Sequence, residues 1–279
     1  MTTDTPPTRF ADVEWGRLAY SEHGTGDDVV VLLHQFLVDK RAQWPVAEYL
    51  AAQGYRVICV DLPGHGESDQ PRSIAAYGLG VSADAVLQLL DALGLDRVFL
   101  GGASFGSQHA LRIALRAPER LVGLWLEMPF ADRGIRNVCY WGGPALIGYS
   151  FSVPLLRVLA PMIRRRGARS GGLGIPLSLL ARDPVATRHL MIGTLSHGIR
   201  PWVADWRQVR TRTLVMGHPY DPVHVRADAL TLSRELPDAE YLHAPSIVAL
   251  RRRPERLMPE VTRFISRCYA DRRDAVIPA

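Results

Sequence analysis

Apolar residues along the chain gather in short continuous runs that alternate with longer stretches of helical spacing. Runs of this length are typical of strands buried in a parallel sheet. We predict strands at 29–36, 55–61, 97–100, 121–126, 213–217 and 239–244. Stretches with apolar residues on one face predict helices at 42–53, 82–93, 108–116 and 254–268. Because the strands are separated by helices, we expect an α/β fold: a mostly parallel central sheet with helices on both faces.

The alternation of strands and helices stops between residues 131 and 207. This segment has helical character, but glycines and prolines interrupt it. The interruptions are Gly142-Gly143-Pro144, Pro154, Pro161, Gly171-Gly172, Pro176, Pro184 and Pro201. We therefore predict a core formed by residues 1–130 and 208–279, with residues 131–207 inserted into it as a separate helical cap.

The pentapeptide Gly-Ala-Ser-Phe-Gly at 102–106 directly follows the predicted strand at 97–100. A serine between two such glycines, after a strand and before a helix, indicates a sharp turn that exposes its hydroxyl. The glycines lack a Cβ, so strand and helix can approach closely while Ser104 takes a strained backbone conformation. Ser104 is accordingly the candidate nucleophile, and a structural glycine turn is the alternative.

This pentapeptide, together with His34-Gln35-Phe36 and the stretch Asp-Leu-Pro-Gly-His-Gly-Glu-Ser at 61–68, resembles the α/β-hydrolase superfamily. The resemblance covers nearly the whole chain in the expected order. It implies that the backbone N–H groups of Phe36 and Phe105 form an oxyanion hole. Gln35 stands where the family usually has glycine, so its amide either restricts the loop or contacts the substrate.

The resemblance also implies a carboxylate after the strand at 213–217, and there the chain reads His-Pro-Tyr-Asp-Pro-Val-His (218–224). Asp221 is the candidate acid of a catalytic triad. An aspartate before a proline is also well suited to cap a helix N-terminus, which is the alternative role.

The family's histidine is missing from its usual place after the last strand. That loop reads Pro-Ser-Ile-Val-Ala-Leu at 245–250, with Ile247 near the position of the base. Isoleucine can neither accept a proton nor be oriented by a carboxylate. We expect an incomplete Ser-His-Asp triad, in which His224 is the better candidate for a relocated base and His243 the weaker one. Both histidines are also compatible with structural roles.

The basic charge of the chain is concentrated in the predicted cap. Residues 131–207 hold eleven arginines and three aspartates, a balance of +8, whereas the whole chain carries +5. The remainder is therefore net negative, and no nucleic-acid-binding motif accompanies the arginines, so we expect no nucleic-acid partner. A basic cap with aromatic residues such as Trp141 favours an apolar small-molecule substrate that is anionic or linked to an acyl carrier. Solvated arginines on the cap surface are the alternative.

Other classes of protein find little support in the sequence. We expect no membrane partner, because no apolar run approaches the ~20 residues that span a bilayer, and a cytoplasmic location, because residues 1–8 do not resemble a signal peptide. Cys59, Cys139 and Cys268 fit no metal-ligand spacing, so we expect neither a metal nor another cofactor. The chain is thus predicted to be an α/β-hydrolase-like enzyme of specialised metabolism, a hydrolase or acyltransferase. A non-hydrolytic cyclase, lyase or isomerase and a non-catalytic binder are the alternatives.

Overall fold

The computed structural model describes residues 6–165, 180–196, 203–219, 221 and 223–276. Its centre is an eight-stranded sheet with the order β1-β2-β4-β3-β5-β6-β7-β8. The strands are β1 (Arg9–Val13), β2 (Gly16–His23), β3 (Val29–Leu33), β4 (Arg56–Val60), β5 (Val98–Ala103), β6 (Leu121–Glu127), β7 (Thr213–Gly217) and β8 (Ala239–His243). From β4 to β8 all neighbouring strands are parallel, which confirms the predicted α/β fold.

The N-terminal hairpin of β1 and β2 was not predicted. β1 pairs antiparallel with β2, and β2 pairs antiparallel with β4. β1 lies at the edge of the sheet, and none of its residues is fully buried. Its sequence therefore needs no continuous apolar run, which is the pattern that identified the central strands.

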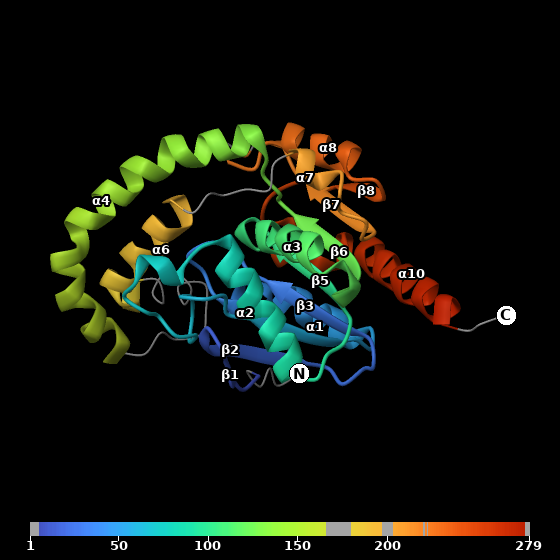
Figure 1. Cartoon of the computed structure of the whole chain (residues 1–279), viewed down its shortest axis with the longest axis horizontal. Helices are drawn as coiled ribbons and strands as arrows, with labels where there is room; N and C mark the ends of the chain where they lie inside the picture. The colour runs from blue at the N-terminus through green and yellow to red at the C-terminus, as the bar shows by residue number, and fades with distance from the viewer. Residues whose placement is uncertain (1–5, 166–179, 197–202, 220, 222, 277–279) are drawn as a thin grey trace.

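Helices cover both faces of the sheet (Figure 1). On one face α1 (Trp44–Ala52) and α10 (Met258–Val276) pack on alternate residues of the strands, among them Val30 and Phe99. On the other face lie α2 (Leu79–Ala92), α3 (Phe105–Arg116) and α8 (Arg226–Glu235), on residues such as Val31.

The short helices are η1 (Lys40–Gln43), η2 (Ile74–Ala76), η3 (Pro118–Arg120), α9 (Ala249–Arg252) and η4 (Pro254–Arg256). Because helices cover both faces, a binding or active site is expected at the edge of the sheet formed by the carboxyl ends of its strands.

The segment between β6 and β7 contains α4 (Asp132–Arg165), α6 (Pro184–Ser196) and α7 (Val203–Trp206). Figure 1 shows α4 as a curved arch at the rim of the molecule, with α6 between it and the core. The expected interruptions at Pro144, Pro154 and Pro161 are wrong, because α4 continues through all three. A proline removes one backbone N–H and crowds the preceding turn, which bends a helix where it does not end it. The predicted breaks at 171–172, 176 and 201 lie outside the described residues.

The expectation that no apolar run approaches membrane-spanning length is also wrong. Asp132–Ile163 is long and apolar enough to cross a membrane by length and composition alone. No charged residue occurs between Arg136 and Arg157. Glycine, serine and proline within this stretch hide it from a search for unbroken runs of large apolar residues.

Candidate active site

Ser104 sits at the turn between β5 and α3, at the carboxyl edge of the sheet. Its φ of 54° lies in the left-handed region, which is costly for a residue with a side chain. The two flanking glycines explain why the turn can form. A Cβ on Gly102 would collide with the backbone of Gly106, and a Cβ on Gly106 would collide with the carbonyl of Leu33. The structure therefore has the sharp strand-to-helix turn expected from the pentapeptide.

The loop after β7 brings two side chains to this serine. Asp221 Oδ1 accepts the backbone N–H of Val223 at 2.7 Å and of His224 at 2.9 Å, which folds the loop back on itself. The other oxygen, Oδ2, lies 2.7 Å from His224 Nδ1. His224 Nε2 in turn lies 2.7 Å from Ser104 Oγ. Carboxylate, imidazole and hydroxyl thus form a continuous hydrogen-bonded chain.

Electrostatics determine which atoms donate and which accept in this series of hydrogen bonds. Partial burial would raise the pKa of Asp221, but hydrogen bonds from the ring and backbone of His224 hold that pKa well below its usual range. The carboxylate is therefore ionised at neutral pH and accepts the Nδ1 proton of His224. The Nε2 lone pair is then left facing Ser104 Oγ, which is the arrangement that general-base activation of a serine requires.

The loop after β8 takes no part in this arrangement. Ile247 is 45% exposed and Val248 is 43% exposed, and neither lines the cavity beside Ser104. His243, at the end of β8, is exposed as well. The imidazole within hydrogen-bond distance of Ser104 comes instead from His224, the residue that the sequence analysis favoured as a relocated base.

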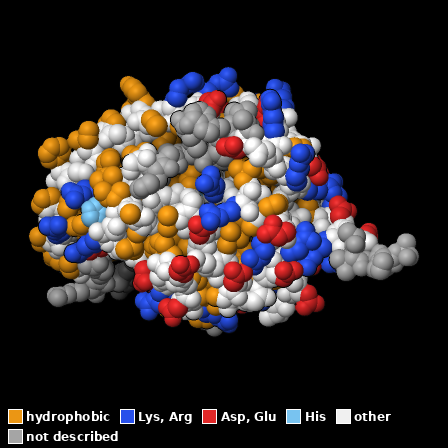
Figure 2. Space-filling view, in the orientation of Figure 1, with side chains coloured by type: hydrophobic (Ala, Val, Ile, Leu, Met, Phe, Trp, Pro, Cys, Tyr) orange, Lys and Arg blue, Asp and Glu red, His pale blue; other side chains and the backbone are white. Residues whose placement is uncertain are grey.

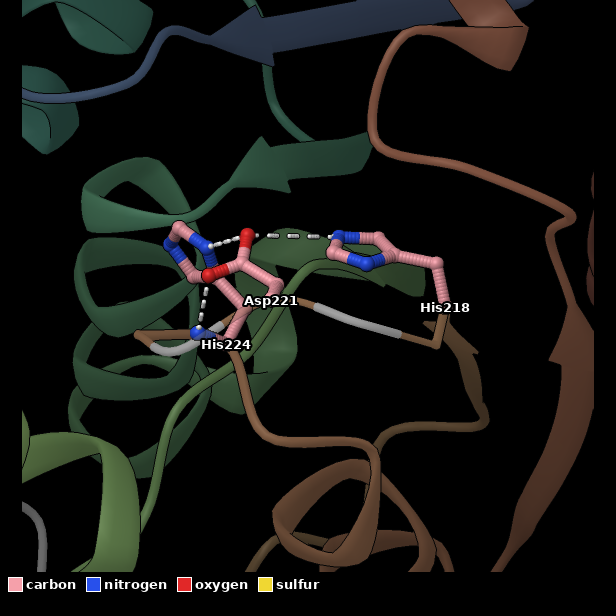
Figure 3. A group of neighbouring side chains, drawn as sticks. All are labelled: His218, Asp221 and His224. Atoms are coloured by element: carbon pink, nitrogen blue, oxygen red, sulfur yellow. Dashed lines mark hydrogen bonds and ion pairs between the residues drawn. The ribbon is translucent and has the colours of Figure 1, made fainter.

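His218 is a further residue at this site, and the sequence analysis did not single it out. Figure 3 shows Asp221 between the rings of His218 and His224. His218 is buried, which lowers its pKa, and its Nε2 lies 3.9 Å from Asp221 Oδ2, beyond hydrogen-bond distance. Its spacing of three residues from Asp221, mirroring that of His224, is the signal that would have drawn attention to it.

These three residues are also close enough together to be considered as a metal site. Ligand atoms arranged tetrahedrally at about 2.0–2.1 Å from Zn²⁺ are roughly 3.3 Å apart. His224 Nδ1 and Asp221 Oδ2 are only 2.7 Å apart, at hydrogen-bond distance. The pair would have to separate to admit an ion, so the geometry fits a proton between them better than a metal.

A cavity of about 310 Å³ opens beside Ser104 and His224. Phe36 and Phe105, predicted to supply the oxyanion hole, both line it, and their rings lie 5.0 Å apart. Phe105 is the first residue of α3, so its backbone N–H has no acceptor within the helix and is of the kind that can donate to a substrate oxygen. The other lining residues are Leu37, Phe130, Val138, Trp141, Gly142, Ala145, Met191, Thr194, Leu195 and Val223. Of the two predicted substrate-binding residues, Trp141 lines the cavity and Gln35 does not; both roles stay predictions.

A second cavity, of about 440 Å³, shares Leu37 with the first and is lined on one side by Arg182. Lys40, also on its wall, forms ion pairs with Asp61 at 2.8 Å and with Glu67 at 2.6 Å. Arg182 is 7% exposed; Nη2 donates to the carbonyl of Gly64, while Nε and Nη1 have no hydrogen-bond partner among the described residues. Burial lowers its pKa to about 10, which still leaves it charged at neutral pH. The sequence analysis missed Arg182 individually, because nothing distinguishes it from the other ten arginines of the predicted cap.

Comparisons with known proteins agree with this fold. The profile of the alpha/beta hydrolase fold family matches residues 28–155. A 2-hydroxy-6-oxononadienedioate/2-hydroxy-6-oxononatrienedioate hydrolase of Dechloromonas aromatica is 34% identical over 127 residues, 43% of each chain. The dihydrolipoyllysine-residue acetyltransferase component of the acetoin cleaving system of Cupriavidus necator is 34% identical over 135 residues, 48% of this chain and 35% of that protein.

Among solved structures, a hydrolase from Pseudomonas aeruginosa superposes with a TM-score of 0.75 at 20% identity, covering 94% of this chain and 99% of that one. The fold and these matches define the class: the chain has the α/β-hydrolase fold, and residues 28–155 match the family of that fold. The chain spans less than half the length of the two curated relatives.

Proposed function

We propose that the protein is a serine hydrolase that cleaves esters of apolar acyl groups through a covalent acyl-enzyme. The observation that carries this proposal is the hydrogen-bonded chain from Ser104 Oγ through His224 to Asp221. An apolar wall beside Ser104 would have favoured a non-hydrolytic reaction; the imidazole found there favours acyl chemistry.

The geometry suggests the order of proton transfers. His224 Nε2 takes the proton of Ser104 Oγ as this oxygen attacks the carbonyl carbon of the ester, and the backbone N–H of Phe105, with that of Phe36, stabilises the resulting oxyanion. His224 then gives the proton to the departing alcohol, which leaves an acyl group on Ser104. A water molecule, deprotonated by His224, attacks that acyl group, and the proton returns to Ser104 as the acid leaves.

The cavity supports an apolar small-molecule substrate. Among the described residues that line it, His224 carries the only titratable side chain, and most of the others are apolar or aromatic. The sequence analysis also predicted that basic residues of the cap attract an anionic or carrier-linked substrate. In the structure this prediction depends on Arg182, which lines the second cavity. Of the predicted cap's arginines with described side chains, Arg182 alone lines either cavity. We propose that an ester carrying a remote carboxylate places the carboxylate there and its acyl chain beside Ser104.

Hydrolysis of p-nitrophenyl esters of increasing acyl length tests the proposed activity. We expect turnover that rises from acetate to a medium chain and that disappears in Ser104→Ala. If wild type and Ser104→Ala release p-nitrophenol equally slowly with every ester, the proposal is wrong and the protein is a binder or a non-hydrolytic enzyme. If an added alcohol captures the acyl group better than water does, the protein is an acyltransferase.

The role of Arg182 is tested separately, with a neutral and a carboxylate-bearing ester of the same acyl chain. We expect Arg182→Gln to lower kcat/KM roughly tenfold for the carboxylate and less than twofold for the neutral ester, since one charge-assisted pair is lost. The preference for the carboxylate should also fade as the pH rises through about 10, where Arg182 loses its proton. Equal effects on the two esters would remove the anionic part of the proposal.

A further inference from the structure

The outer face of α4 exposes a continuous stripe of large apolar side chains. Phe151 is 84% exposed, Val158 is 64% exposed and Ile147 is 60% exposed. From Ile147 onward the stripe recurs every three or four residues, and Tyr140 lies seven residues, or two turns, before Ile147, so its members share one side of the helix. It consists of Tyr140, Ile147, Phe151, Leu155, Val158 and Met162. Figure 2 shows hydrophobic side chains gathered along the rim that α4 forms in Figure 1, with basic side chains among them.

The inner face of α4 already has its partners. Val153 and Ala160 are buried, and the helix packs against α6. A helix on the surface of a soluble domain normally turns polar residues outward. α4 is apolar on both sides, and the part of the protein that the structure describes covers only the inner one. An exposed apolar surface of this extent marks a place where something else binds.

Charge indicates what binds there. From residue 133 to 165 the sequence contains no acidic residue, and Arg133, Arg136 and Arg157 are exposed. In a symmetric contact between two copies, the same basic helix would face itself with no α4 carboxylate to pair with its arginines. Apolar side chains beside arginines, with Tyr140 and Trp141 near one end, instead fit an anionic lipid surface.

We propose that α4 lies in the surface of an anionic bilayer, with the stripe among the acyl chains and the arginines at the lipid phosphates. Val153 and Ala160 remain packed against the protein, so the helix rests in the interface and does not span the membrane. Trp141 belongs both to the exposed surface and to the wall of the cavity beside Ser104. The cavity therefore adjoins the docked face, and an apolar molecule could pass into it directly from the lipid. This replaces the expectation that the protein has no membrane partner.

Vesicle flotation tests the docking, and the Ser104→Ala protein is used throughout so that the result is independent of the proposed hydrolase activity. Vesicles of phosphatidylcholine containing roughly a third phosphatidylglycerol should carry the protein upward. The triple variant Ile147→Gln, Phe151→Gln, Leu155→Gln should bind these vesicles at least about tenfold more weakly, because interfacial binding scales with buried apolar area. A matched control, Phe10→Gln, Val81→Gln, Val248→Gln, changes three exposed apolar residues elsewhere and should bind like the parent.

The arginines are tested in the same assay. Replacing Arg133 and Arg136 with Gln, or omitting phosphatidylglycerol, should weaken binding roughly tenfold or more, given the usual contribution of a basic residue at an anionic surface. Undiminished binding of the triple variant would overturn the proposal. So would a dimer of the parent that the triple variant lacks, in the absence of vesicle binding, since the stripe would then be a contact between copies. Resistance to alkaline extraction would also contradict it, because the helix would then span the bilayer.

Discussion

The loops after β7 and β8 leave the same edge of the sheet side by side, yet only one of them reaches Ser104. The β7 loop supplies both Asp221 and His224, three residues apart in a turn that the aspartate itself closes. The β8 loop, where the superfamily usually has its histidine, turns Ile247 and Val248 toward solvent. The comparison teaches that a catalytic triad is defined by the geometry of its groups and not by the strand from which each one comes.

The β8 loop has a structural task instead. The α9 helix that follows it carries Arg251, which forms an ion pair with the buried Glu127 at the end of β6 and donates to Gln43 Oε1 at 3.0 Å. Glu127 lies next to the elbow, because its backbone carbonyl accepts the N–H of Ser104 at 2.8 Å. The two loops therefore have different roles. The β7 loop carries the residues of the proposed chemistry, and the β8 loop leads to an ion pair that stabilises the edge of the sheet.

The largest effect is expected from His224→Gln, which removes the imidazole and keeps size and polarity. We expect ester hydrolysis to fall by roughly 10⁴–10⁶-fold, as when a triad histidine is lost. Because the triad acts as a unit, the double variant with Ser104→Ala should be little slower than either single variant. The matched control is His243→Gln, at the end of β8, which should retain full activity; a loss there instead would assign the base to the β8 side.

Asp221→Asn comes next, with an expected fall in kcat of ~10⁴-fold. An amide can donate to His224 Nδ1 and stabilise the wrong tautomer, while its oxygen can still close the turn. Circular dichroism should therefore remain that of the wild type. A variant that keeps more than a tenth of the wild-type kcat would show that Asp221 only shapes the loop.

Arg251→Met should act on stability and leave the chemistry intact. Removing the cation leaves Glu127 buried without its partner, at a cost of about 2–3 kcal/mol, below the usual cost for fully buried pairs since Arg251 is partly exposed. For a chain of this size that corresponds to a fall in Tm of roughly 5–10 °C. We expect kcat to stay within about threefold of wild type at 20 °C. A large loss of kcat with an unchanged Tm would reverse the assignment of roles to the two loops.

Ile247→His should have the smallest effect. Placing a histidine at the usual family position in the His224→Gln background should restore hydrolysis by less than threefold, because residue 247 faces solvent. Rescue of tenfold or more would mean that the β8 loop can still reach Ser104, and the distinction between the loops would then be one of degree.

Much of the fold could be predicted because the central strands are continuous apolar runs, such as Val29–Leu33, that are buried on both faces. The N-terminal hairpin could not, since the edge strand β1 has no buried run and polar residues interrupt the apolar ones in β2. The inserted segment was predicted as interrupted helices because proline usually ends a helix. In α4 tertiary packing against α6 supports the bends, and that support cannot be read from local sequence.

For the candidate site, the motifs located Ser104 and Asp221, and spacing favoured His224 over His243. The distance that joins His224 to Ser104 depends on how the β7 loop folds, which three residues of sequence do not determine. His218 and Arg182 were missed because their burial depends on residues far away in the chain. The catalytic and binding roles of all these residues remain predictions.

The central claim is that His224 activates Ser104. Its most direct test is the rate at which a fluorophosphonate probe modifies Ser104, followed by intact-mass measurement in the wild type and in His224→Gln. The family pattern, with no histidine after the last strand, would predict slow labelling in both proteins. The geometry predicts rapid stoichiometric labelling of the wild type at Ser104 and labelling at least ~10²-fold slower in His224→Gln. Equal rates in the two proteins would contradict the account.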